Sequence, residues 1–143
     1  MKKLFSLLLV LFLLTGSACA STQFYKYNAL AKMYGAPLLT EEMLMDETEG
    51  KIAYDSGDLC FIFIPDSNSA IVYGADSADF LPACVCASFT LGYSEDAVEF
   101  LGNLLYSYMT VKSGKELSYG YYGSMYFTIS SKEDFLLFAI GEP

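Results

Sequence analysis

The stretch from Leu59 to Ile64 is the part of this sequence that most constrains the fold. Its six residues, Leu-Cys-Phe-Ile-Phe-Ile, are all apolar, and Pro65 follows directly. A strand with water on one face alternates apolar and polar residues, whereas this run is apolar at every position. Because proline cannot donate a hydrogen bond to a neighbouring strand, it marks the end of the run. We therefore expect a central strand over 59–64 that is covered on both faces.

Weaker patterns of the same kind predict the other strands. Turn residues separate short apolar or alternating runs, such as Asp66-Ser67-Asn68-Ser69 before the third strand. A fully apolar run also predicts the last strand, and a glycine-bounded loop over 120–123 predicts a hairpin before it. The expected strands cover residues 51–55, 59–64, 70–73, 115–119, 124–130 and 135–140.

Helical spacing of apolar residues predicts three helical regions. The first, over 21–46, is in two pieces: Gly35-Ala36-Pro37 ends the first, and Thr40 caps a second, short helix before an acidic loop over 46–50. The next helix begins at Asp76 or Asp79 and reaches about Leu91. Another follows, capped by Ser94 and ended by 113–114.

Together these elements predict an α+β domain. The order is an N-terminal helical segment, three strands, a central helix pair and three more strands. Gly50-Lys51 opens the first strand set and Gly114-Lys115 opens the second, so the sets resemble each other weakly. We expect two three-stranded units that join in one antiparallel sheet of about six strands, packed by the helix pair.

The first twenty residues predict export. Lys2 and Lys3 precede an apolar run over 4–14, and the small residues of 15–20 follow. This order is typical of a signal peptide, and the apolar run is too short to span a bilayer. The predicted organisation is therefore a signal peptide over 1–20 and a single globular domain over 21–143.

Cys19 leaves two kinds of processing open. Ala18-Cys19-Ala20 fits ordinary cleavage, which would leave Ser21 as the new N-terminus. Residues 16–19 instead resemble a bacterial lipobox, in which Cys19 would be lipidated and retained. Both place the protein outside the cytoplasm, either as a membrane-anchored lipoprotein or as a secreted or periplasmic protein.

Three cysteines remain in the predicted domain: Cys60, Cys84 and Cys86. Two positions apart on a helix, Cys84 and Cys86 point to nearly opposite sides and should not bond to each other. A disulfide, if one forms, would join Cys60 to Cys84 or Cys86. The odd number fits one disulfide with a spare thiol, or three reduced thiols.

The charge is strongly acidic. The chain has 8 basic residues, all of them lysine, against 17 acidic ones, for a net charge of −9. Loss of Lys2 and Lys3 with the signal would leave six basic residues and a net charge of −11. Such a surface repels phosphate, which argues against nucleic acid and against anionic lipid headgroups. Membrane attachment is expected only through lipid on Cys19.

Signatures of catalysis are sparse. The chain has no histidine, so the commonest general base and metal ligand is missing, and no phosphate-binding or dinucleotide motif follows a strand. We expect no metal and no cofactor, and no enzymatic activity. The alternative is a hydrolase that uses paired carboxylates. The candidate pairs are Asp46/Glu49, Asp55/Asp58, Glu95/Glu99 and Glu133/Asp134.

The tyrosine-rich hairpin is the candidate contact surface. Tyr119, Tyr121, Tyr122 and Tyr126 lie around the predicted loop, and Tyr121 and Tyr122 are expected at its tip. Tyrosine offers rigid amphipathic contact area, although it is also a favoured strand residue. We therefore predict a non-catalytic domain that binds a protein, a peptide or a small apolar ligand. A structural or inhibitory module that acts through a sheet edge is a further alternative.

Overall fold

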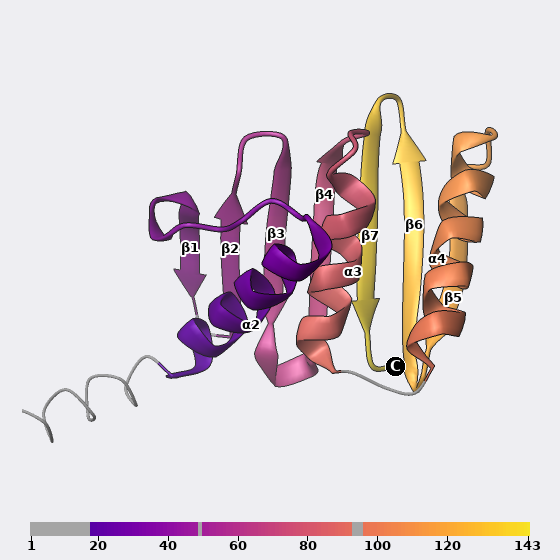
Figure 1. Cartoon of the computed structure of the whole chain (residues 1–143). Coiled ribbons are helices and arrows are strands. Elements are labelled where there is room, and N and C mark those ends of the chain that lie inside the picture. Colours follow the sequence, from indigo (N-terminus) through magenta and orange to yellow (C-terminus); the bar gives the residue numbers. More distant parts are fainter. Residues whose placement is uncertain (1–17, 49, 93–95) are drawn as a thin grey trace, which may run out of the picture.

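The structure, a computed structural model, describes residues 18–48, 50–92 and 96–143. They form an α+β fold in which three α-helices lie on one face of a single antiparallel sheet (Figure 1). The predicted fold class is confirmed. The helices are α2 (Ala18–Tyr34), α3 (Phe80–Leu91) and α4 (Ala97–Lys112), and the short 3-10 turns are η1 (Glu41–Met43) and η2 (Pro65–Ser67). Ser94, the predicted helix cap, lies outside the described residues.

The sheet has seven strands, in the spatial order β1-β2-β3-β4-β7-β6-β5, and every neighbouring pair is antiparallel. Two units, β2-β3-β4 and β5-β6-β7, join through the β4–β7 pair, as predicted. The strands are β1 (Leu44–Thr48), β2 (Lys51–Asp55), β3 (Leu59–Ile64), β4 (Ser69–Ala75), β5 (Leu117–Tyr122), β6 (Met125–Lys132) and β7 (Phe135–Gly141).

The seventh strand, β1, corrects the prediction of a second helix after Thr40. Thr40 makes no capping hydrogen bond through its side chain, and the helical turn η1 lasts only three residues. The chain then pairs with β2, with Glu47 opposite Ile52 and Thr48 opposite Lys51. The acidic residues predicted as a loop are thus mostly strand, because an available strand edge satisfies their backbone groups.

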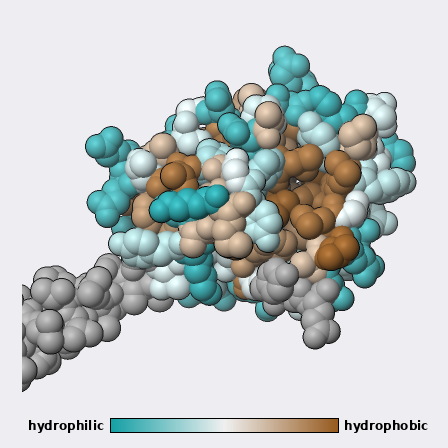
Figure 2. Space-filling view, viewed as in Figure 1, coloured by the Kyte–Doolittle hydropathy of each residue, from teal (hydrophilic) through white to brown (hydrophobic). Residues whose placement is uncertain are grey.

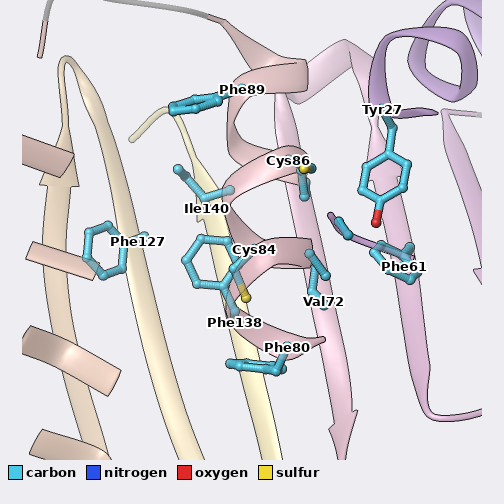
Figure 3. Packing of buried hydrophobic residues seen from close by; sticks show 14 of the residues in the cluster. Tyr27, Phe61, Val72, Phe80, Cys84, Cys86, Phe89, Phe127, Phe138 and Ile140 are labelled. Atoms are coloured by element: carbon cyan, nitrogen blue, oxygen red, sulfur yellow. The ribbon is translucent and has the colours of Figure 1, made fainter. Parts of the chain in front are cut away.

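The hydrophobic core lies between the helices and the sheet (Figure 3). Alternate residues of each central strand point into it, and Phe61, Val72, Phe127 and Phe138 are fully buried. α3 lies over β4 and β7 (Figure 1) and contributes Phe80, also fully buried, while Phe61 packs against α2 and Phe127 against α4. Phenylalanine side chains bury large apolar areas, so this layer accounts for most of the hydrophobic stabilisation.

α2 is anchored over β3 by specific contacts. The Tyr27 ring lies 5.1 Å from that of Phe61, and its hydroxyl donates a 2.9 Å hydrogen bond to the carbonyl of Pro37. The Asn28 side chain makes two hydrogen bonds to the backbone of Leu39, in the segment that follows α2. Its amide donates to the carbonyl of Leu39 at 2.9 Å and accepts from the Leu39 N–H at 2.8 Å. These bonds explain why the segment after Gly35 folds back along the helix.

The opposite face of the sheet corrects the expectation of a strand covered on both sides. No helix among the described residues packs there, and in β3 the outward side chains Cys60, Ile62 and Ile64 are only partly buried. We call this surface the open face. On β3 to β7 it consists of Cys60, Ile62, Ile64, Ser69, Ile71, Tyr73, Leu117, Tyr119, Tyr121, Tyr126, Thr128, Ser130, Lys132, Phe135, Leu137 and Ala139.

Candidate functional site: the open face of the sheet

A cluster of tyrosines occupies the β5–β6 end of the open face. Tyr121 pairs directly with Tyr126, and their ring centroids are 5.6 Å apart. Tyr119 lies on the same face of β5, 5.8 Å from Tyr126. We call these three residues the tyrosine cluster. Tyr119 and Tyr121 are 62% and 59% exposed, so the cluster presents its rings to solvent.

Tyr122, predicted to share the tip with Tyr121, is buried and does not belong to this surface. It is the last residue of β5, and its side chain is 1% exposed. Its ring lies 4.4 Å from that of Phe100, and its hydroxyl donates a 2.8 Å hydrogen bond to the carbonyl of Gly92. Residues 120–122 are strand rather than loop, and the hairpin turns at Gly123 and Ser124.

The rest of the open face is mainly apolar. Along one row of paired residues, Ile62, Ile71 and Ala139 lie side by side on β3, β4 and β7. The next row contains Tyr73 and Leu137, which are partners in the β4–β7 register. Apolar side chains, exposed at Leu137 and half-buried at the other four positions, thus extend across the open face to β3.

Charge is confined to the margins of this face. On β3 to β7, Lys132 is the charged side chain that the described residues place there, and it is the last residue of β6. Lys51 and Asp55 stand at the two ends of β2, beyond β3. In a chain with a net charge of −9, an uncharged area of this width is typical of the centre of a protein interface.

Two shallow hollows lie on the open face. The larger, of about 740 Å³, is bounded by Tyr73, Ser130, Phe135 and Leu137 together with the β6–β7 turn. The smaller, of about 270 Å³, lies at the other end of the strands beside Ile64, Tyr126 and Ala139. Both open to solvent, so they give the surface relief rather than an enclosed ligand cavity.

No disulfide joins the cysteines of the described residues, which is one of the two outcomes that the sequence left open. All three are unpaired, and Cys60 lies on the open face, while Cys84 and Cys86 are buried residues of α3 itself. The sheet therefore separates Cys60 from the other two. Burial raises the pKa of the Cys86 thiol to about 11 and that of Cys84 well above its ordinary value. Figure 3 shows Cys84 towards Phe138 and Cys86 on the side of α3 that faces Tyr27.

The polar group closest to a catalytic arrangement joins α4 to the segment before α3. Asp76 pairs with Lys112 and accepts a 2.7 Å hydrogen bond from the Tyr108 hydroxyl. The bond from Lys112 lowers the pKa of Asp76, and Asp76 in turn raises that of Lys112. Burial and the bond to Asp76 raise the pKa of Tyr108. Each shift moves the group away from neutral pH, which suits an ion pair rather than proton transfer.

Among the proposed carboxylate pairs, Glu133 and Asp134 line an open hollow of about 410 Å³ together with Asp76 and Lys112. Asp55 accepts a 2.8 Å hydrogen bond from the Gly57 N–H, a local turn bond, and Glu133 and Asp134 lie in the β6–β7 turn. Glu49 and Glu95, and so two of the four pairs, fall outside the described residues. No group of three or more potential metal ligands occurs within the described ranges.

A second apolar area lies on the helix-bearing side, over the region of α3 and α4 (Figure 2). On α4 it includes Val98, Leu105 and Met109, which are exposed. The helix buries Ala97, Phe100, Leu104, Ser107 and Val111 on its other side. α4 is thus apolar on more than the side that contacts the sheet.

Comparison with protein-family models, curated proteins and solved structures finds no match. Within the part of the chain that the structure describes, no helix is both long and apolar enough to cross a membrane. Residues 1–17, most of the predicted signal, and the side chain of Cys19 are outside that part, so its lipidation stays a prediction.

Proposed function

We propose that this chain is an exported, non-catalytic binding domain that holds a protein partner on the open face. The tyrosine cluster is the main support for the proposal. It lies at the edge of a wide apolar area whose side chains point away from the hydrophobic core. Tyr and Phe give large, rigid contact area at a low conformational cost, and interface centres are enriched in them.

The shape of the face favours a protein over a small apolar ligand. The two hollows are open, and the exposed side chains spread over β7, β6 and β5, with half-buried ones on β4. Small-molecule sites enclose most of their ligand, whereas protein interfaces are broad and close to flat. A partner that lies flat across these strands would cover Tyr121 and Leu137 together.

Site-specific photo-crosslinking in the producing cell tests this proposal. A benzophenone amino acid replaces Tyr121, and a matched control replaces Tyr106, a tyrosine on α4 that is 73% exposed. We expect a protein adduct after irradiation at position 121 and none at position 106, because only the former lies on the open face. Absence of an adduct at 121, or equal adducts at both positions, would contradict the proposal.

Export is tested on the same protein without any variant. Mass spectrometry of the native N-terminus distinguishes a diacylated Cys19 from a free Ser21. Either product supports export. An intact Met1 in a chain recovered from the cytoplasm would contradict it.

A further inference from the structure

We propose that the partner on the open face is a second copy of this chain, packed face to face about a two-fold axis. This inference rests on the proposed function and names its partner. The axis runs parallel to the strands, between β4 and β7. It places β4 opposite β7 of the second copy, β3 opposite β6, and β2 opposite β5. Two antiparallel sheets then stack, each with its helices outside.

The size of the face matches what a stable dimer needs. Its most exposed side chains present roughly 700 Å² in total, close to the ~800 Å² that each partner buries in a standard interface. The largest exposed patch of an ordinary monomer is smaller, about 300–600 Å². The side chains are Leu117, Tyr119, Tyr121, Tyr126, Phe135 and Leu137.

The strand register sets large side chains on the open face of one copy opposite smaller ones on the open face of the other. In the middle row, the axis sets Ile71 opposite Ala139 of the second copy and Ile62 opposite Thr128. In each case a large side chain meets a smaller one. Interdigitation of large and small residues is how stacked sheets fill the space between them.

One outer position follows the same pattern, whereas Ile64 and Tyr73 face the large side chains of Tyr126 and Leu137. Tyr119, at the end of the middle row, faces Ala53 of the second copy, a small residue on the open side of β2. Because the contact is isologous, every such pair occurs twice.

Two of the three marginal charges, Lys132 and Lys51, have complementary partners under the same axis, whereas Asp55 faces Leu117 of the second copy at the rim. Lys132 comes beside the turn over 55–58 of the second copy, which carries Asp55 and Asp58. Lys51 lies over the ring of Tyr121, an arrangement that suits a cation–π contact. The uncharged middle strands meet each other, so no unpaired charge is buried at the centre. The remaining acidic surface of each copy stays in solvent.

Sedimentation equilibrium of the protein, as the producing cell processes it, tests the dimer. We expect a dimer at micromolar concentration for the wild type. Leu137→Glu places a charge against Tyr73 of the second copy and should weaken the dimer at least about a hundredfold. The matched control is Leu105→Glu on α4, at a position 53% exposed against 41% for Leu137, and it should remain a dimer.

A wild type that stays monomeric would overturn the proposal, as would a dimer that Leu105→Glu dissociates and Leu137→Glu does not. Circular dichroism shows whether each variant is folded. Tyr119→Glu, at a highly exposed position opposite Ala53, provides a second disruption that leaves the core untouched.

A charge pair tests the register. Ile62→Glu and Thr128→Lys should each be monomeric alone, because each buries one unpaired charge. An equimolar mixture should form heterodimers, since the axis sets residue 62 of one copy opposite residue 128 of the other. A mixture that stays monomeric would overturn this axis.

The crosslinked adduct at position 121 separates the two proposals. An adduct of twice the chain mass supports the second copy. An adduct of any other mass would overturn the proposal that the partner is a second copy, but it would support a different protein partner. If no adduct forms, both proposals are overturned.

Discussion

The two faces of one sheet differ in what covers them. The helix-bearing face buries Phe138 completely, whereas the open face leaves Phe135, three residues earlier on β7, 55% exposed. Both faces are built from the same strands and both are largely apolar. The difference shows that, within the described residues, one helical layer serves two apolar faces, so the second face lies at the surface (Figure 1).

The largest effect should come from removing a phenylalanine on one face and then on the other. Phe138→Ala opens a cavity in the core and should lower the free energy of unfolding by about 3–5 kcal/mol. Phe135→Ala, the matched control, should lower it by less than about 1 kcal/mol. Urea unfolding in the Leu137→Glu background, where we expect a monomer, measures both. Equal losses would show that the faces do not differ as described.

An intermediate effect concerns the thiols, which divide between the faces. Iodoacetamide should label Cys60 in the native protein and label Cys84 at least about a hundredfold more slowly, because burial hides the Cys84 thiol and raises its pKa. Labelling of Cys60 should also slow as protein concentration rises, and Leu137→Glu should remove that dependence. The unfolded chain, in which all three thiols react alike, is the control; native labelling of Cys84 as fast as Cys60 would contradict the assignment.

The smallest effect lies at the polar margin of the helix-bearing side. The hydrogen bond from Lys112 lowers the pKa of Asp76 in the folded protein from its ordinary value of 3.8. The ion pair therefore stabilises the fold above pH 3.8, and this contribution is lost as the pH falls through the lower, folded-state pKa. Asp76→Asn should therefore make the loss of stability below about pH 4 shallower, with little change near neutrality because the pair is exposed. Urea midpoints over an acidic pH series measure this.

Asp134→Asn, an exposed carboxylate in the β6–β7 turn, is the matched control for that series and should keep the wild-type slope. If Asp76→Asn also keeps the wild-type slope, the ion pair does not contribute to acid stability.

The hairpin shows where local patterns were sufficient and where they were not. Turn chemistry predicted a hairpin between β5 and β6, and it is there, but the strand runs three residues further than expected, to Tyr122. Side chains alternate along a strand, so this extension sends Tyr121 outward and Tyr122 inward against Phe100. Composition does not distinguish the two tyrosines, whereas their positions along β5 place them on opposite faces of the sheet.

The face on which Cys60 lies and the strand β1 were beyond the reach of local patterns for a related reason. Sequence spacing placed Cys60 in an apolar strand but could not assign it to a face, and the open face is the one away from α3. Residues 44–48 follow the helix-start signal at Thr40 and were predicted as helix end and acidic loop, yet they pair with β2. Both outcomes depend on contacts with other segments, and local propensity does not contain them.

Local patterns in the sequence by themselves determined the α+β class, two strand units around a helix pair, and the presence of strands that are apolar on both faces. These follow from periodicity and turn residues, which act over a few positions. Only the tertiary structure decided which apolar face the helices cover. All three described helices pack on one side of the sheet, and the apolar side chains on the other side are left at the surface.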